Sequence, residues 1–231
     1  MGALFELQKC KRMRKAILLV WIFMTFSGVS QYSKVMDNLT LTSKILNGER
    51  KYAIYLPPDY ETSQRKYPVL YLLHGSGDDQ TGWIQFGEVL QITDKAIKDG
   101  LATPMVIVMP DAKSGRKGYF NSFDGKWNYE TFFFEELIPF IEKKYRIKSE
   151  KRYRAIAGLS MGGGGAFIYA LRHPEMFSSA CPLSGAMGKL SYNEFYKKNE
   201  AKLKMLNREK IYNYYSNHNA LSIIKNQTDA N

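Results

Sequence analysis

Residues 152–165 carry the sequence RYRAIAGLSMGGGG, in which a short apolar run is followed at once by small residues. The first six positions predict a β-strand, and residues 161–172 predict a helix. Ser160 stands in the turn between them, with Gly158 two positions before it and Gly162 two positions after it. Glycines at this spacing let a tight strand-to-helix turn hold a serine in an unfavourable backbone conformation, with its hydroxyl clear of the sheet. The pattern predicts a nucleophilic serine at position 160.

The glycine run allows two other interpretations. A phosphate-binding loop does not fit, because the G-x-x-x-x-G-K-[ST] pattern is absent and the dinucleotide register from Gly162 places Phe167 where a small residue is needed. Close packing of the helix against the sheet is compatible with a nucleophile. Such packing is the expected role of Gly164 and Gly165.

Apolar runs and helical patterns alternate along the rest of the chain. Strands are predicted at residues 51–56, 68–73, 105–109, 152–157 and 177–183, and crossover helices at residues 88–99 and 130–145. In the first of these helices, Val89, Ile92, Ala96 and Ile97 form the expected apolar face. This alternation predicts an α/β fold with a mainly parallel sheet covered by helices on both faces. Residues 191–231 show weak helical periodicity and predict an excursion over the sheet edge.

A second glycine-containing loop follows the apolar strand at residues 68–73. It begins with His74 and Gly75, and Ser76 lies between Gly75 and Gly77. Acyl transfer needs two N–H donors aimed at the oxyanion of the tetrahedral intermediate. The backbone N–H groups of Met161 and Ser76 are the expected donors. His74 is favoured as a structural hydrogen-bonding residue over a catalytic base.

The N-terminus has the pattern of a secretory signal peptide. Five Lys and Arg residues precede position 16, an apolar run extends from Ala16 to Val29, and Gly28 and Ser30 are small. The apolar run is shorter than the ~20 residues of a membrane-spanning helix. We expect a signal peptide at residues 1–30 and an export destination in the periplasm or outside the cell, with no membrane anchor left after its removal.

The remaining residues, 31–231, are expected to form one domain. The chain has 231 residues, 45% of them hydrophobic, and 2 Cys, of which only Cys181 lies beyond the leader. Removing the leader leaves 28 Lys and Arg against 21 Asp and Glu. These charges are mixed in sequence, which argues against a nucleic-acid partner. No cofactor is implied, and the three histidines lack the spacing of metal ligands.

Three segments together carry a resemblance to a known family. YPVLYLLHGSGDD from Tyr67, VIVMPDA from Val106 and AGLSMGG from Ala157 resemble the putative-esterase family of α/β-hydrolases. That family includes feruloyl esterases, S-formylglutathione hydrolases, enterochelin esterases and mycolyltransferases, and the exported bacterial feruloyl and acetyl-xylan-type esterases are the most similar. The resemblance implies Ser160 as nucleophile, with the N–H groups of Met161 and Ser76 as oxyanion hole. Trp83 matches an aromatic position of the family, where packing is favoured over substrate binding.

The chain departs from this family after the serine, where an acid and then a histidine should follow. His173 lies at the end of the helix that Ser160 begins, roughly 20 Å away, and Asp229 has no strand before it. His218 stays a less favoured candidate base, because its surroundings resemble the family's insertion over the site. We therefore expect the acid, the base and the last strands of the fold to be missing, which would leave the strand at residues 177–183 as an uncovered apolar edge.

The sequence thus predicts an exported serine ester hydrolase that cleaves feruloyl or acetyl esters of plant polysaccharide through an acyl-enzyme on Ser160. One alternative is a catalytically inactive remnant or carbohydrate-binding protein, and another is an acyltransferase of the same family. The aromatic segment at residues 119–129 is favoured as packing over an aryl-binding wall. The sequence does not indicate an oligomeric state.

Overall fold

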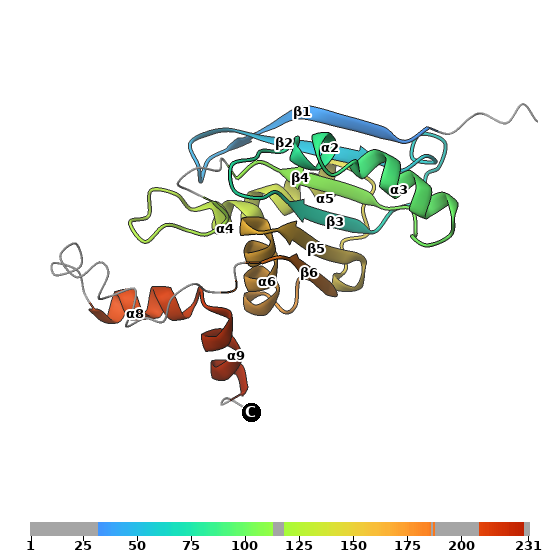
Figure 1. The fold of residues 1–231 in the computed structure, drawn as a ribbon. Helices are drawn as coiled ribbons and strands as arrows, with labels where there is room; N and C mark the ends of the chain where they lie inside the picture. The colour runs from blue at the N-terminus through green and yellow to red at the C-terminus, as the bar shows by residue number, and fades with distance from the viewer. Residues whose placement is uncertain (1–31, 113–117, 186, 188–207, 229–231) are drawn as a thin grey trace, which may run out of the picture. The chain divides into compact units, whose positions relative to one another are not determined.

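A six-stranded sheet forms the centre of the fold in the computed structural model, which describes residues 32–112, 118–185, 187 and 208–228. The strand order is β1-β2-β4-β3-β5-β6. The strands are β1 (Lys34–Ser43), β2 (Gly48–Leu56), β3 (Val69–Leu73), β4 (Val106–Pro110), β5 (Arg154–Leu159) and β6 (Ser179–Leu183). The pairs β1/β2 and β2/β4 are antiparallel, and the remaining neighbours are parallel (Figure 1). The mainly parallel sheet expected from the sequence is confirmed.

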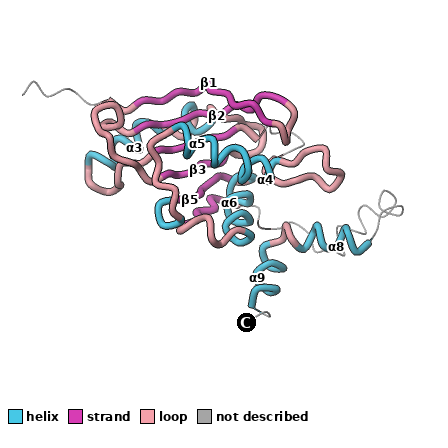
Figure 2. Tube along the Cα trace, turned by 180° about the vertical axis from the view of Figure 1, so that it is seen from behind, coloured by secondary structure: helices cyan, strands magenta, loops and turns pink. Residues whose placement is uncertain are grey.

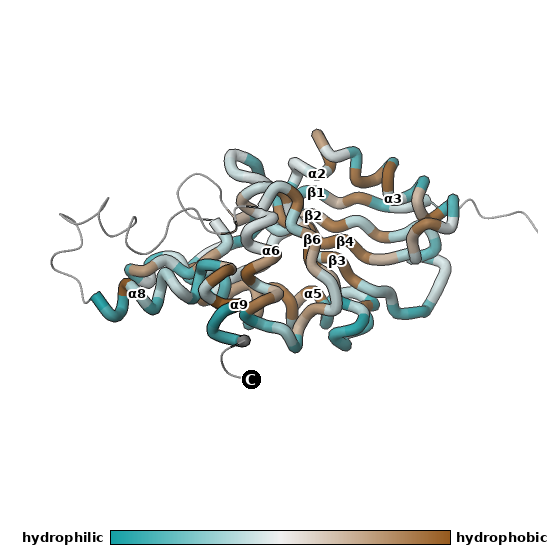
Figure 3. The backbone as a smooth tube through the Cα atoms, turned by 60° about the horizontal axis from the view of Figure 1, so that its bottom comes forward, coloured by the Kyte–Doolittle hydropathy of each residue, from teal (hydrophilic) through white to brown (hydrophobic). Residues whose placement is uncertain are grey.

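Successive residues of the central strands enter two separate cores on opposite faces of the sheet. In β3, Val69, Tyr71 and Leu73 belong to the larger core, whereas Leu70 and Leu72 pack in the smaller one. This alternation follows from the two-residue period of a strand, and it explains why these strands are apolar throughout. The brown of β3 and β4 in Figure 3 reflects that composition.

Helices cover both faces, as the alternating pattern predicts. The larger core lies under α4 (Tyr129–Phe132), η1 (Phe133–Leu137), α5 (Ile138–Lys144) and α6 (Met161–Arg172). The smaller core lies under α2 (Gly82–Gln85) and α3 (Val89–Lys98), on the opposite side of the sheet (Figure 2). A 3-10 turn, η2 (Lys151–Tyr153), precedes β5.

The predicted helix at residues 130–145 contains a π-helical segment, η1. Its C-cap residue Ile138 donates its N–H to the carbonyl of Phe133, five residues earlier. Pro139 follows and has no N–H to donate, and its ring would collide with the carbonyl of Glu135 in a regular α-helix. The wider turn avoids that collision.

Two expectations about the first half of the chain were incomplete. Strand β1 was not predicted, because its pairing with β2 shifts register between Met36 and Leu39 and its residues are mostly polar. In α3 the predicted apolar face was wrong for Ile92, which is 60% exposed. The helix instead turns Asp94 toward the sheet, where its Oδ1 accepts a 2.7 Å hydrogen bond from the Tyr55 hydroxyl.

The C-terminal excursion contains two helices, α8 (Arg208–Ser216) and α9 (Ala220–Thr228). Ile168 of α6 packs with Ala220 and Ile223 of α9, and the Gln227 side chain donates a 2.8 Å hydrogen bond to the carbonyl of Leu171. The weak periodicity of this region therefore hid real helices. The expected signal peptide at residues 1–30 and Asp229 lie outside the described residues.

Strand β6 forms one edge of the described sheet, as expected for the strand predicted at residues 177–183. Leu183 is 44% exposed there, and Cys181 is exposed with a free thiol. Across the described ranges, we find no helix with the length and apolar character needed to cross a bilayer.

Candidate active site

Ser160 lies in the turn between β5 and α6, at the N-cap position of the helix. Its backbone angles are φ 54° and ψ −107°, a conformation that is strained for a residue with a Cβ atom. Two backbone bonds hold it there: its N–H donates to the Leu183 carbonyl at 2.8 Å, and its carbonyl accepts from the Gly164 N–H at 2.9 Å. The residue is exposed, as the sequence predicted for this turn.

The glycines around Ser160 are required by close backbone contacts. A Cβ on Gly158 would lie 2.4 Å from the carbonyl oxygen of Gly162, and a Cβ on Gly162 would lie 2.4 Å from the Leu73 carbonyl oxygen. A Cβ on Gly165 would lie 3.1 Å from the ring of Tyr119. The first two glycines shape the turn, and Gly165 allows α6 to pack closely, as expected.

The contact at Gly162 also brings the loop after β3 beside the start of α6. Gly75 lies near the carbonyl of Leu159, and its own carbonyl accepts a 3.4 Å bond from the N–H of Asp78. Gly77 turns the chain with a φ of +89°, and Ser76 is exposed between the two glycines. The first N–H groups of an α-helix have no partner within the helix, and their partial positive charge faces outward.

His74 is built into the support of this loop. It is 2% exposed, its Nδ1 lies 2.8 Å from the Gly75 carbonyl oxygen, and its Nε2 accepts a 3.0 Å bond from the Ala112 N–H. Because Nε2 is an acceptor, the ring proton is on Nδ1 and is donated to Gly75. Tyr119 adds a bond from its hydroxyl to the His74 carbonyl, at 3.1 Å. Both ring nitrogens are thus engaged, which agrees with the favoured structural role.

Trp83 also has a structural environment. Its indole N–H donates to the Leu73 carbonyl at 3.1 Å, and its ring packs against the smaller core. A Cβ on the neighbouring Gly82 would lie 1.7 Å from a carboxylate oxygen of Asp78, so a larger residue there would require the Asp78 side chain to move. These contacts fix the helix α2 beneath the loop that carries Ser76.

The other two histidines lie toward the opposite end of α6. His173 caps that end, and its Nε2 lies 3.3 Å from Oε1 of Glu130. His218, between α8 and α9, donates from Nδ1 to the Tyr214 carbonyl at 2.6 Å and accepts a 3.1 Å bond from Arg172 at Nε2. The 12 residues of α6 extend about 18 Å. The structure therefore does not bring His218 to Ser160.

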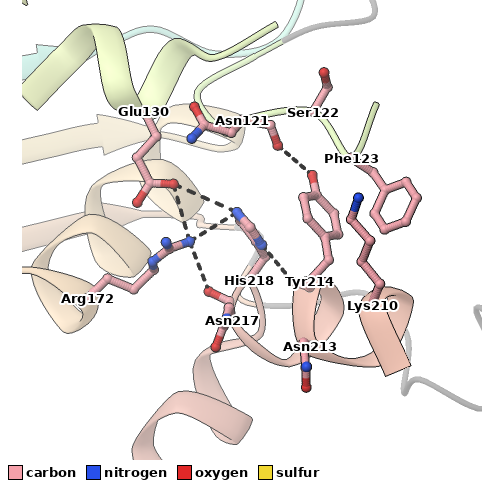
Figure 4. A pocket seen from close by; sticks show the side chains of 10 residues that line it. All are labelled: Asn121, Ser122, Phe123, Glu130, Arg172, Lys210, Asn213, Tyr214, Asn217 and His218. Atoms are coloured by element: carbon pink, nitrogen blue, oxygen red, sulfur yellow. Dashed lines mark hydrogen bonds and ion pairs between the residues drawn. The ribbon is translucent and has the colours of Figure 1, made fainter. Parts of the chain in front are cut away.

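Sequence reasoning missed Glu130, which contacts Arg172 and His218 (Figure 4) and also His173. It is 4% exposed, and its Oε2 lies 3.2 Å from Arg172 and 3.7 Å from His218. Burial alone would raise the pKa of Glu130, but the hydrogen bond from His173 and the charge of Arg172 oppose it, and the pKa is lowered to about 2. In the sequence, Glu130 shows only as an acidic residue at the start of a helix.

Two adjoining cavities lie beside this cluster. One, of about 340 Å³, is bordered by Glu130, Arg172 and side chains of α8, and the other, of about 490 Å³, by residues 120–127. Neither is lined by Ser160. Of the aromatic segment at residues 119–129, Tyr119, Trp127 and Tyr129 are buried in the core, as the packing interpretation expects. Within the described ranges, no group of three or more His, Cys, Asp or Glu side chains is arranged so that it could hold a metal ion.

Known proteins share this fold and these motifs. The chain is similar to Esterase Rv1288 of Mycobacterium tuberculosis, at 43% identity over 136 residues that make up 57% of this chain and 28% of the relative. It is similar to an endo-1,4-beta-xylanase/feruloyl esterase of Xylanibacter ruminicola, at 40% identity over 141 residues, or 57% of this chain and 19% of the relative. The chain thus spans less than a third of either relative.

Solved structures agree on the architecture. A ferulic acid esterase superposes with a TM-score of 0.67 and 44% identity, covering 70% of this chain and 62% of that protein. An S-formylglutathione hydrolase of Staphylococcus aureus gives a TM-score of 0.62 at 19% identity, which supports the fold alone. The fold is that of the α/β-hydrolase esterases. The family model described as putative esterase matches residues 43–228, and the chain therefore belongs to the putative-esterase family.

Proposed function

We propose that this chain is a serine carboxylic-ester hydrolase in which Ser160 forms the acyl-enzyme. The observation that carries the proposal is the strained, exposed position of Ser160 at the N-terminus of α6, beside the loop of Ser76. The N–H groups of Met161 and Ser76 are the proposed donors to the oxyanion. Gly158 and Gly162, which cannot carry side chains, support the geometry.

In the proposed reaction, Ser160 Oγ attacks the ester carbonyl carbon and the C–O bond to the alcohol breaks, so the alcohol leaves with a proton. Water then releases the acid from Ser160 and restores its hydroxyl. The proton of Ser160 needs an acceptor, and each of the three histidines is hydrogen-bonded elsewhere in the described structure. Without a histidine base, an oxyanion hole and binding still give a residual rate acceleration.

The proposed substrates are feruloyl or acetyl esters of plant polysaccharide. The support comes from the names of similar proteins, an endo-1,4-beta-xylanase/feruloyl esterase and a ferulic acid esterase. Export through the N-terminal leader is part of the proposal, since a polysaccharide substrate lies outside the cell. Acyl transfer to a sugar hydroxyl uses the same acyl-enzyme with a different acceptor.

Hydrolysis of methyl ferulate and p-nitrophenyl acetate tests the proposal. We expect Ser160→Ala to abolish the turnover that the 231-residue chain shows above the buffer rate. Ser76→Ala is the matched control, because it removes a hydroxyl from the same site and keeps the backbone N–H. Equal turnover in the wild-type chain and Ser160→Ala would refute the role of Ser160.

A second candidate is a protein that binds carbohydrate without catalysis. The engagement of all three histidines away from Ser160 favours it. A fluorophosphonate probe separates the two candidates, because rapid stoichiometric labelling that disappears in Ser160→Ala requires an activated serine. Absence of labelling in the folded chain, together with absence of turnover, supports the non-catalytic candidate.

A further inference from the structure

The smaller cavity, of about 340 Å³, has the size of a small-molecule site, for which ~300 to 1,000 Å³ is typical. Its walls come from the turn at residues 121–123, from Glu130, from Arg172 at the end of α6, and from α8 with the residues that follow it. Figure 4 shows side chains from these separate segments converging on one space. The cavity is therefore a product of the tertiary fold.

Glu130 gives this cavity a buried acceptor that lacks a hydrogen-bond donor. Its Oε2 has no hydrogen bond in the described structure, although the residue is only 4% exposed. Nη1 of Arg172 is 3.2 Å away, but it donates to the carbonyl of Asn217 and to Nε2 of His218. The ion pair with Arg172 stabilises the carboxylate, and its Oε2 can still accept a hydrogen bond from a ligand hydroxyl.

The wall of the cavity carries charges of both signs. Oε2 of Glu130 can accept a further hydrogen bond, whereas Arg172 and Lys210 would repel a cationic donor. A neutral hydrogen-bond donor therefore suits Glu130 better than a cationic one. Hydroxyl groups meet this requirement, because each both donates and accepts.

Two aromatic rings complete the chemistry. The ring centroids of Phe123 and Tyr214 lie 5.5 Å apart in an edge-to-face arrangement, and the Tyr214 hydroxyl is anchored by a 2.7 Å bond to the Asn121 carbonyl. Both rings line the 340 Å³ cavity and also the adjoining cavity of about 490 Å³. Because both side chains border both cavities, they suit a ligand with more than one ring. The faces of such a ligand would be apolar, and its edges would carry hydroxyl groups.

The backbone links this region to the proposed nucleophile. A Cβ on Gly118 would lie 3.3 Å from the sulfur of Met161, next to Ser160, and Phe120 packs edge to face against Tyr169 and against His218. Residues 118–121 thus follow α6 from its N-terminus toward the cavities. About 18 Å of helix separates the two ends.

We propose that the paired cavities between residues 120–127, Glu130 and α8 form a binding subsite for a neutral oligosaccharide. The hydroxyls of a sugar unit donate to Glu130, and its apolar face packs on Phe123 and Tyr214. In the proposed esterase, this subsite would hold the sugar chain while its ester group reaches Ser160. That role rests on the proposed function. Sugar binding itself does not need a reactive serine.

Calorimetric titration of the 231-residue chain with xylotetraose tests the subsite. We expect saturable binding that Glu130→Gln weakens roughly tenfold, since the change removes a hydrogen bond to a charged acceptor. Phe123→Ala should weaken binding by a similar factor without touching the buried cluster. Phe86→Ala is the matched control, because Phe86 is 80% exposed and lines neither cavity.

The outcome for the subsite can be separated from that for the esterase. Ser160→Ala should bind xylotetraose as tightly as the wild-type chain, even if no ester is cleaved. Absence of saturable binding in the folded wild-type chain would overturn the subsite, and so would equal affinities of the wild type and Phe123→Ala. Sodium ferulate that displaces xylotetraose would also overturn it, because that result places both ligands in one site.

Discussion

The two ends of α6 hold different chemistry. At its N-terminus, Ser160 is exposed and strained, and the groups that surround it are glycines and backbone N–H and C=O groups. At its C-terminus, Arg172 and His173 meet the buried Glu130. The N-terminal end depends on backbone conformation, and the C-terminal end depends on paired charges. The first can be encoded locally, whereas the second depends on segments that only the fold brings together.

The largest loss of stability is expected from a substitution at the close backbone contact beside Ser160. Gly162→Ala places a Cβ 2.4 Å from the Leu73 carbonyl oxygen and 2.6 Å from that of His74. Because both are backbone atoms of a buried strand end, we expect a loss of about 3 kcal/mol or more in the free energy of unfolding. Urea denaturation followed by circular dichroism measures it.

Gly77→Ala provides the comparison for that loss. Gly77 has a φ of +89° with no other group within 4 Å of a Cβ, so the change adds backbone strain and no collision. We expect a cost of about 1 kcal/mol. Equal losses in the two variants would show that collision does not govern the turn.

The next effect concerns pH at the other end of α6. The pKa of Glu130 is lowered from 4.5 to about 2, so its ionised form stabilises the fold. This contribution, about 3 kcal/mol at about 1.4 kcal/mol per pKa unit, is complete above pH 4.5 and is lost as the pH falls toward 2.

Urea unfolding of the wild type and Glu130→Gln between pH 2 and 7 checks this contribution. The stability difference between the two proteins should be largest above pH 5 and should shrink toward pH 2. A difference that stays constant across this range would mean that the cluster does not depend on the charge of Glu130.

His74→Phe should cost about 2 kcal/mol of stability, since it removes the acceptor of the buried Ala112 N–H and the donor to the Gly75 carbonyl. Tyr119→Phe, which removes one hydroxyl bond to the same residue, should cost less. Thermal unfolding ranks the two variants. A His74→Phe protein as stable as the wild type would contradict the structural role.

The smallest effect has the opposite sign. Ser160→Gly relieves the strain at φ 54° and ψ −107° and should raise the free energy of unfolding by about 1 kcal/mol. Ser160→Ala, which keeps the Cβ, should not. A calorimetric comparison of the two melting temperatures measures the strain directly, and equal melting temperatures would argue that the turn is relaxed.

The difference between the two ends also marks how far sequence reasoning extends. The turn at Ser160 could be predicted because two glycines, an apolar run before them and a helical segment after them all lie within a short window. Strand β1 could not, because a register shift breaks its alternation. The π-helical turn does have a local signal in the sequence, because Pro139 cannot fit inside a regular α-helix without a collision.

Glu130 had no such signal. Its partner His173 lies 43 residues later in the chain, and His218 follows in the turn between α8 and α9. A carboxylate at the start of a helix ordinarily faces solvent and favours the helix dipole. The burial that gives this one its role follows from long-range packing, which periodicity does not record.

The hydrogen bond from Ser160 to Leu183 links the turn at Ser160 to the outermost strand on its side of the described sheet. Rim strands fray more readily than central ones, so amide exchange at position 160 should report how firmly β6 is attached. A reagent coupled to Cys181 on that strand would disturb the serine without approaching it. The stability of strand β6 at the edge of the sheet therefore determines how firmly the Ser160 hydroxyl is held in position.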